Sequence, residues 1–256
     1  MSVIWGDVLA QVALVMPMAG RGSRFSREGA ALPKPLMSLW GMPFFWWAAE
    51  SARRSFRVAE MAFVVLEEHV RDFAIDRHIR DHYPQARLAV SPHVTSGAAA
   101  TAKLGIEMLD SDRPLIVNDS DHAFTLQPRA RVADRLRNGT GAALLTFQSQ
   151  DPAYSYARLD KDGSVTGTVE KQVVSSDAIA GAYLFASADA FMGAYRRYEE
   201  DYPYDEVFVS GLYNHLNGAS AHIARQRLDK HISFGTPAEL AALEAAGLRQ
   251  PWASWL

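Results

Sequence analysis

The most informative part of this chain is the stretch VALVMPMAGRGSRFSREGAALPKPLMSLWGMP, residues 12–43. It opens with an apolar run, residues 12–16, which predicts a buried strand. A loop of small residues follows, and a Pro-Lys-Pro triplet comes about ten residues later. Glycines let backbone N–H groups approach an anion closely, and Arg24 and Lys34 add positive charge to the same segment. The order of strand, glycine loop and basic side chains therefore predicts a polyphosphate site.

Two other glycine-rich sites are less compatible with this loop. A dinucleotide fingerprint would need a third glycine, but Ser23, Arg24 and Phe25 follow Gly22. The ending Gly-Lys-Ser/Thr of a P-loop is also missing. A tight strand-to-helix turn remains the alternative to a phosphate site, and Arg21 is explained equally well as a solvated loop arginine.

Composition indicates an ordinary globular enzyme. With 256 residues, 48% hydrophobic and 21% charged, the chain can form one large α/β domain. A net charge of −3 argues against a nucleic-acid partner, and no apolar run approaches a membrane span. The absence of cysteine excludes disulfides and thiol catalysis. The N-terminus lacks a basic leader, so we expect a cytoplasmic protein without a signal peptide or a membrane partner.

Strand and helix patterns alternate through residues 1–150 and change character in residues 151–256. We therefore predict one domain over 1–256: an α/β three-layer sandwich with a mixed, mostly parallel sheet. The expected strands are 12–16, 61–66, 87–90, 115–118, 142–147, 156–160, 164–170 and 178–186. The expected helices are 44–55, 70–82, 99–109, 129–137, 189–200 and 207–216. Phe44 to Trp47 should be core, and the tail with Trp252 and Trp255 should dock on its own chain or in an oligomer contact.

Two carboxylates follow the apolar run 115–117. Asp119 and Asp121 therefore lie at the carboxyl end of a strand, where open α/β sheets bind their ligands. Mg²⁺ prefers carboxylate and phosphate oxygens and uses few protein ligands. The spacing predicts a metal site here, although helix capping or a surface turn would use the same residue types.

These motifs together resemble the nucleotidyltransferases that make NDP-sugars and related activated compounds. The resemblance rests on AGRGSRF, PKPL, TSGAAAT (95–101), NDSDHAF (118–124), VEK (169–171), GAYLF (181–185) and FGTPAEL (234–240), in the family's order. It implies Mg²⁺-dependent transfer of a nucleoside monophosphate from CTP, UTP or dTTP to a phosphorylated acceptor, releasing pyrophosphate. The compact form and the sequence PMAG are similar to enzymes of bacterial capsule and surface-polysaccharide pathways, which activate sugar 1-phosphates or other phosphorylated small molecules.

The resemblance also implies roles for particular residues. Arg24, Lys34 and Lys171 would be catalytic, the last as the contact to the acceptor phosphate. The nucleotide would be bound by Met18, Ala19, Gly20, Arg21, Gly22, Ser23, Thr95, Ser96, Gly97 and Asn118. The acceptor would be bound by Tyr156, Glu170, Gly181, Tyr183, Glu206 and Ser210. A predicted helix over 207–216 would place Glu206, Ser210 and Asn214 on one face.

The metal site departs from the family pattern at one position. The family often supplies a second ligand from an aspartate two residues before Gly-Thr-Pro, and this chain has Ser233 there. Asp121 fits the first ligand better than Asp119. Asp229 or His231 could supply the second, with Asp229 preferred, or one protein carboxylate and phosphates could hold the metal. His231 is more typical of a packed or solvent-facing histidine, since imidazole suits softer metals.

Two other functions remain open at the level of the sequence. A glycosyltransferase that consumes NDP-sugars would share an aspartate-rich metal site but would not need AGRGSRF with PKPL. A catalytically silent paralogue that binds nucleotides and regulates a partner is the second alternative, favoured by Ser233 alone. Adjacent opposite charges such as Glu170 and Lys171 are also common as solvated ion pairs.

Overall fold

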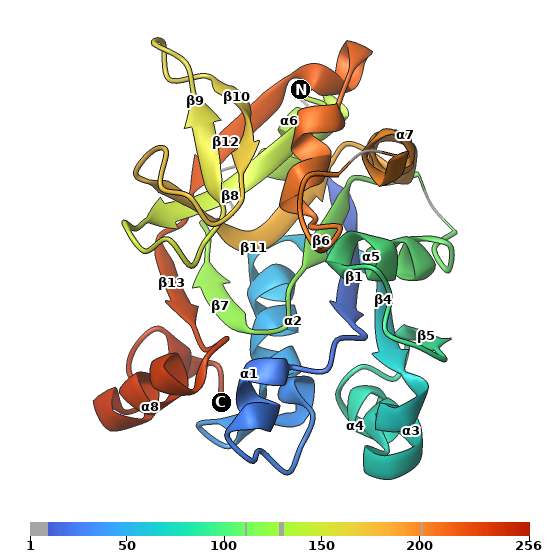
Figure 1. Ribbon diagram of the computed structural model, residues 1–256, viewed down its shortest axis with the longest axis vertical. Helices are drawn as coiled ribbons and strands as arrows, with labels where there is room; N and C mark the ends of the chain where they lie inside the picture. The colour runs from blue at the N-terminus through green and yellow to red at the C-terminus, as the bar shows by residue number, and fades with distance from the viewer. Residues whose placement is uncertain (1–9, 111, 128–130, 201) are drawn as a thin grey trace, which may run out of the picture.

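A mixed nine-stranded sheet forms the middle layer of the protein (Figure 1). The computed structural model describes residues 10–110, 112–127, 131–200 and 202–256. The strand order is β10-β9-β11-β6-β1-β4-β5, with β8 beside β11 and β12 beside β8. The strands are β1 (Gln11–Met18), β4 (Arg57–Leu66), β5 (Arg87–Ser91), β6 (Leu115–Asn118), β8 (Ala142–Gln148), β9 (Tyr156–Leu159), β10 (Val165–Val169), β11 (Asp177–Phe185) and β12 (Ile223–Arg227).

The strands of the first half run parallel, and those that join in the second half are mainly antiparallel. In the parallel part, Leu14 of β1 aligns with Met61 on one side and Ile116 on the other. Strand β11 runs antiparallel to β6, β8 and β9. This confirms the predicted α/β fold with a mixed sheet. Two short pairs lie outside it: β2 (Ser38–Leu39) with β3 (Met42–Pro43), and β7 (His122–Thr125) with β13 (Lys230–Ser233).

Helices cover both faces of the sheet, so its strands are buried on both sides. Leu14 and Met16 of β1 pack in the core cluster that contains helix α2, whereas Ala13 and Val15 pack in the cluster that contains α5 and α7. Successive side chains of a strand point to opposite faces, which explains the continuous apolar run. The helices are α1 (Ser23–Arg27), α2 (Phe44–Ser55), α3 (Glu67–Phe73), α4 (Ile75–His82), α5 (Ala98–Ile106), α6 (Val132–Arg137), α7 (Ala188–Glu200) and α8 (Pro237–Ala246).

Aromatic side chains fasten α2 and the C-terminal tail to the core. Phe44 to Trp47 are all buried, as predicted. The Trp47 indole N–H donates to the Leu39 carbonyl oxygen at 2.7 Å. Trp255 stacks on Trp47 with ring centroids 5.9 Å apart, beside the short 3-10 turn Trp252–Ser254. The tail therefore docks on its own chain.

Three predicted helices differ from the structure. The helix expected over 70–82 is two helices, α3 and α4, which meet at Ala74 in the left-handed conformation with φ 50°. The helix expected over 207–216 is only a 3-10 turn, Ser210–His215 (η3), because the backbone of Val207 hydrogen-bonds to another loop. The helix expected over 129–137 spans 132–137, and residues 129 and 130 lie outside the described part.

Bilayer-spanning helices are missing from the part of the chain that the structure describes: none there is both long and apolar enough.

Candidate active site

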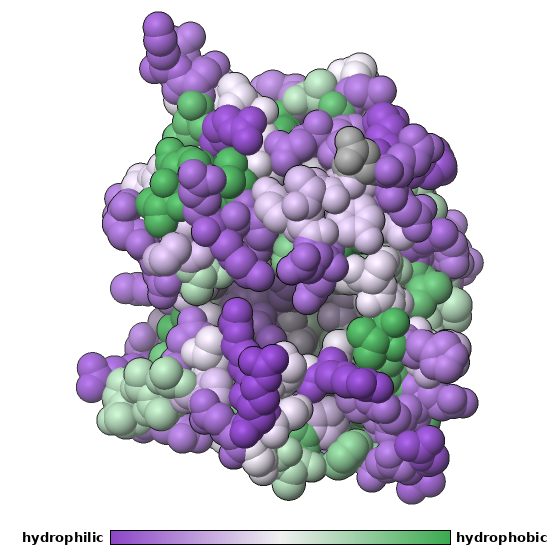
Figure 2. Space-filling view, viewed as in Figure 1, coloured by the Kyte–Doolittle hydropathy of each residue, from purple (hydrophilic) through white to green (hydrophobic). Residues whose placement is uncertain are grey.

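A cavity of about 930 Å³ opens beside the carboxyl ends of β1 and β6. Figure 2 shows it as a hollow in the middle of one face, rimmed mainly by hydrophilic side chains. This is the edge at which open α/β sheets bind ligands, and the volume suits a nucleotide-sized molecule. Most of the predicted site residues line it: Ala19, Gly20, Arg21, Gly22, Ser23, Arg24, Lys34, Thr95, Ser96, Gly97, Asp119, Asp121, Glu170, Lys171, Gly181, Tyr183 and Glu206.

The glycine loop presents free backbone donors to this cavity. Gly22 adopts the left-handed conformation with φ 58° directly before α1, and a Cβ there would lie 2.7 Å from the Lys34 Cβ. The backbone N–H groups of Gly20, Arg21 and Gly22 donate to no other residue of the described part. Unpaired N–H groups around a concave loop suit an anion. Only glycine therefore allows both the turn and the approach of Lys34.

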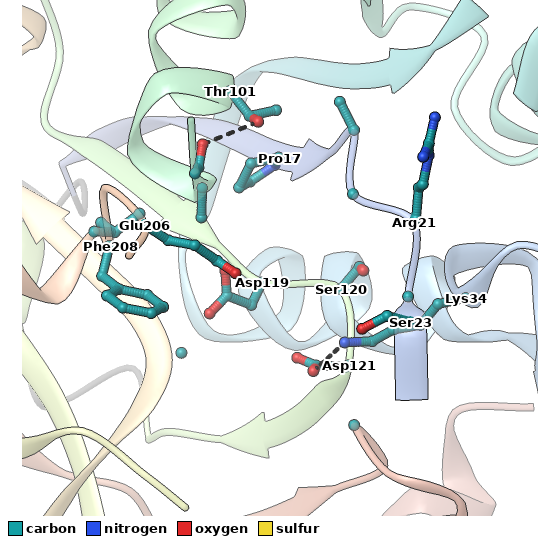
Figure 3. A pocket seen from close by; sticks show the side chains of 18 of the residues that line it. Pro17, Arg21, Ser23, Lys34, Thr101, Asp119, Ser120, Asp121, Glu206 and Phe208 are labelled. Atoms are coloured by element: carbon teal, nitrogen blue, oxygen red, sulfur yellow. Dashed lines mark hydrogen bonds and ion pairs between the residues drawn. The ribbon is translucent and has the colours of Figure 1, made fainter. Parts of the chain in front are cut away.

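Lys34 forms an ion pair across the cavity floor. Its ammonium nitrogen lies 2.5 Å from Asp121 Oδ2, and both side chains are about three-quarters buried (Figure 3). Burial alone would raise the pKa of Asp121, but the charge and hydrogen bond of Lys34 hold it below its usual value. Asp121 is therefore ionised at neutral pH and can bind a cation.

Asp119 behaves differently although it lies only two residues away. Burial, and then the negative charge of Asp121, raise the pKa of Asp119 to about 8. The side chain lies beside Gly181, where an added Cβ would be 3.1 Å from Asp119 Oδ2. One carboxylate of the pair is thus charged and the other is protonated at pH 7 until a cation arrives.

The side-chain ligands of the cavity suit Mg²⁺, which uses few protein ligands, and do not suit a metal whose coordination is completed by protein side chains alone. Across the described ranges, no three His, Cys, Asp or Glu side chains converge on one point. Asp121 and Asp119 supply the hard oxygens that Mg²⁺ prefers, and phosphate and water must complete the shell. Gly235 leaves room beside Asp121, because a Cβ there would lie 2.5 Å from Oδ2. Ser233 also lines the cavity.

His122 and His231, two histidines near these carboxylates, pack against other aromatic rings. Their rings lie 5.6 Å apart, and His231 stacks on Phe147 with centroids separated by 3.9 Å. Burial lowers the pKa of His122 to about 4 and that of His231 to about 3. Both imidazoles are therefore neutral at pH 7, and neither adds positive charge to the site.

The small-residue loop 95–97 is fixed by hydroxyl groups. Thr95 Oγ1 lies 2.6 Å from Thr101 Oγ1 and donates to the Gly97 carbonyl at 2.9 Å. Val207 lies against the same loop: its N–H donates to the Ser96 carbonyl at 2.9 Å. These hydrogen bonds hold the loop against Val207, and its side chains are small enough for close approach to a flat ring.

Glu170 and Lys171 lie at the other end of the cavity. Glu170 Oε2 accepts hydrogen bonds from Ser155 Oγ at 2.5 Å and Ser210 Oγ at 2.7 Å. Lys171 has a left-handed backbone with φ 52°, and its ammonium lies 5.0 Å above the ring of Phe208. These residues are held by specific contacts, which a solvated ion pair would not need.

Five predicted site residues have side chains that do not line the cavity. Asn118 donates its amide to the Ala48 carbonyl in the core, and Met18 is also a core residue. Tyr156 is fully buried, with its hydroxyl on the Asp151 carbonyl. Asp229 is exposed, accepts from the Gln127 N–H and does not line the cavity. Ser210 does not line the cavity itself but donates a hydrogen bond to the carboxylate of Glu170, which does.

Several lining residues were not predicted from the sequence. Phe208 was missed because the sequence predicted a helix over 207–216, and the helical spacing of apolar residues gave no reason to assign Phe208 to the site. Ser155 adjoins the predicted Tyr156, and the alternation of strand β9 could have shown that one of the two faces the cavity. Glu68 pairs with Arg21 at 3.5 Å, and no motif signals it.

Comparisons with known proteins identify the family to which the chain is similar. The family model described as nucleotidyl transferase matches residues 13–231. The bifunctional protein GlmU of Thermus thermophilus is 27% identical over 253 residues, covering 95% of this chain and 53% of the relative. The chain thus spans about half the length of the curated relatives it matches.

Solved structures share the fold. A nucleoside-diphosphate-sugar pyrophosphorylase from Vibrio cholerae superposes with a TM-score of 0.74 at 24% identity, covering 90% of this chain and 98% of that one. A candidate glucose-1-phosphate thymidylyltransferase from Bacillus anthracis superposes with a TM-score of 0.73 at 17% identity, covering 95% and 99%.

Proposed function

The chain belongs to the nucleotidyl transferase family, and from this premise we propose that it transfers a nucleoside monophosphate from an NTP to a phosphorylated small molecule. The observation that carries the proposal is the cluster of Gly22, Lys34 and Asp121 at the floor of the cavity. It combines free backbone donors, a fixed ammonium and an ionised carboxylate within one loop and one strand end. Those are the groups that a triphosphate with its cation requires.

The reaction balances without an oxidant or a general base. An oxygen of the acceptor phosphate attacks the α-phosphorus of the NTP and forms a new P–O bond. The bond from the α-phosphorus to the bridging oxygen breaks, and pyrophosphate leaves. Because the acceptor phosphate is already ionised at neutral pH, the protein contributes mainly positioning and charge neutralisation.

The first half of the chain, residues 1–150, supplies the nucleotide end of the site. The free N–H groups of the glycine loop, with Arg24 and Lys34, hold the β- and γ-phosphates. Asp121, with Asp119, would hold Mg²⁺, which would neutralise charge on the phosphates. Loop 95–97 lies against the base, and its small side chains favour the flat edge of a pyrimidine in CTP, UTP or dTTP.

The second half, residues 151–256, supplies the acceptor end. Lys171 contacts the acceptor phosphate, and Glu170 accepts hydrogen bonds from acceptor hydroxyls through the carboxylate oxygen that its two serine partners leave free. The names of the structural relatives favour a sugar 1-phosphate as acceptor. On the sequence resemblance, we propose that the product feeds surface-polysaccharide synthesis.

A substrate screen tests this function. CTP, UTP and dTTP are each mixed with Mg²⁺ and a panel of sugar 1-phosphates and other phosphorylated acceptors, and pyrophosphate release is followed. We expect release with at least one pair, and a fall of roughly 30- to 1,000-fold in Lys171→Ala, as the loss of one charge-assisted phosphate contact predicts. Lys161→Ala, an exposed lysine in the β9–β10 turn, is the matched control. Release of NDP in a separate arm that supplies an NDP-sugar in place of the NTP would identify a glycosyltransferase, and nucleotide binding without turnover would identify a silent paralogue.

A further inference from the structure

One short segment of the second half touches both ends of the cavity. Residues 204–209 lie between loop 95–97, which we assign to the base, and the pair Glu170 and Lys171, which we assign to the acceptor. Figure 3 shows two of its side chains, Glu206 and Phe208, among the residues that line the cavity. Val207 and Val209, which alternate with them, are buried.

The nucleotide end of this segment is joined to the base loop by backbone hydrogen bonds. The Val207 N–H donates to the Ser96 carbonyl at 2.9 Å, and the Val207 carbonyl accepts from the Ala99 N–H at 3.0 Å. Gly97 makes this approach feasible, because a Cβ at Gly97 would lie 2.5 Å from the Val207 nitrogen. A displacement of the loop would therefore move Val207 as well.

The acceptor end is joined by two aromatic side chains. The Phe208 ring lies 5.0 Å below the Lys171 ammonium, a cation–π distance. Tyr204 packs edge-to-face on Phe208 with centroids 5.7 Å apart, and its hydroxyl accepts from the Glu170 N–H at 3.3 Å. The aromatic pair thus contacts the backbone N–H of Glu170 and the ammonium of Lys171.

We propose that segment 204–209 couples nucleotide binding to the acceptor site, with Phe208 as the positioning residue. When a base binds against loop 95–97, it restricts the remaining motion of the loop and of Val207, which is hydrogen-bonded to it. The restriction extends through Phe208 and Tyr204 to Glu170 and Lys171. The acceptor site is then organised before the acceptor arrives. This inference rests on the proposed function, since it assigns the base to one loop and the acceptor to the other.

Amide hydrogen exchange, resolved by NMR, measures this coupling without an acceptor. The probes are CTP, UTP and dTTP, each added with Mg²⁺. Binding should slow exchange at Ala99 and Val207 directly, and at Glu170 by about tenfold, within the usual range of coupling between sites. In Phe208→Leu, the protection of Ala99 and Val207 should remain and that of Glu170 should be lost, while Phe208→Tyr should restore it.

Further variants separate the outcomes. Tyr204→Phe removes only the acceptor of the Glu170 N–H and should abolish the effect at that amide even if Phe208→Leu does not fold. Tyr202→Leu, a half-buried aromatic that does not line the cavity, should behave as wild type. Coupling is overturned if a nucleotide protects Ala99 but leaves Glu170 unchanged, or protects Glu170 equally in Phe208→Leu. If no nucleotide protects Ala99, the proposed base site itself is rejected, and the coupling with it.

Discussion

Lys34 and Asp121 form the charged contact on which the nucleotide end of the site depends. Neither side chain is part of the hydrophobic core, and Lys34 follows the glycine loop in a short 3-10 turn, η1 (Lys34–Leu36). The ammonium both neutralises Asp121 and faces the cavity. A change at this position should therefore alter binding far more than folding.

Lys34→Ala tests that expectation. We expect NTP affinity and kcat/KM to fall together, by about 2–4 kcal/mol of charge-assisted hydrogen bonding, with a melting temperature within a few degrees of wild type. Calorimetry of NTP binding beside a thermal melt measures both. A melting temperature that drops in step with activity would instead make Lys34 a structural residue.

The two aspartates at the end of β6 should not be equivalent. Asp121 is held ionised by Lys34, whereas the pKa of Asp119 is raised to about 8, chiefly by burial. Asp121→Asn should therefore abolish Mg²⁺-dependent turnover, and Asp119→Asn should reduce it less. Turnover rates over a Mg²⁺ titration compare the two variants. A greater loss in Asp119→Asn would show that Asp119 is the principal ligand.

His231 should make the protein less stable in mild acid. Burial, with His122 nearby, lowers its folded pKa to about 3, below the unfolded value of about 6.5, so the unfolded state takes up a proton first. Its contribution to stability is present above pH 6.5 and is lost as the pH falls toward 3.

His231→Phe isolates this effect, because phenylalanine can keep the stacking on Phe147. Between pH 7 and pH 5 the variant should lose less stability than wild type, by at most about 2 kcal/mol. Urea unfolding at the two pH values gives the difference. Equal losses in both proteins would show that His231 is accessible to protons in the folded state.

The turn between β13 and α8 limits the space around the metal-binding carboxylate. Strand β13 pairs with β7, and the Phe234 N–H donates to the Asp121 carbonyl at 2.9 Å, which brings Gly235 against the carboxylate. A Cβ at Gly235 would lie 2.5 Å from Asp121 Oδ2, so the side chain would have to move.

Gly235→Ala should therefore raise the Mg²⁺ concentration needed for half-maximal turnover, by about tenfold if roughly 1.4 kcal/mol of binding is lost. Gly193→Ala, in the middle of helix α7 with ordinary clearance to Arg197, is the control and should leave the Mg²⁺ dependence unchanged. An unaltered requirement in Gly235→Ala would mean that the metal does not depend on this position of Asp121.

The elements predicted well from the sequence are those marked by a pattern of neighbouring residues, such as a continuous apolar run. Helix α2 has the predicted bounds, 44–55, and β6 ends at Asn118 as expected, because continuous apolar runs identify buried elements. The segment around Val207 was predicted wrongly as a helix. Its backbone donors and acceptors pair with Ser96 and Ala99, a tertiary contact that no local pattern reports.

The same limit applies within the site. Asp121 and Lys34 could be predicted, because a strand end and a motif locate them. Asn118 was assigned to the nucleotide although its amide turns into the core to reach Ala48 of α2. Successive side chains of a strand point to opposite faces of the sheet, and the sequence alone does not show which of them face the cavity. Asp229, the predicted second metal ligand, precedes β13, accepts from the Gln127 N–H and does not line the cavity, and this contact has no local signal in the sequence.

At the scale of the whole molecule, one cavity joins the two halves of the chain, with basic residues and the glycine loop at one end and Glu170 and Lys171 at the other. The central claim is that the acceptor attacks the α-phosphorus between these ends.

The fate of isotopic label on the NTP tests this claim most directly. With the substrate pair found by the screen, α-labelled NTP should transfer its label to the acceptor product, and γ-labelled NTP should release its label as pyrophosphate. Label from the γ-position in orthophosphate, or α-label recovered as free NDP, would contradict the claim.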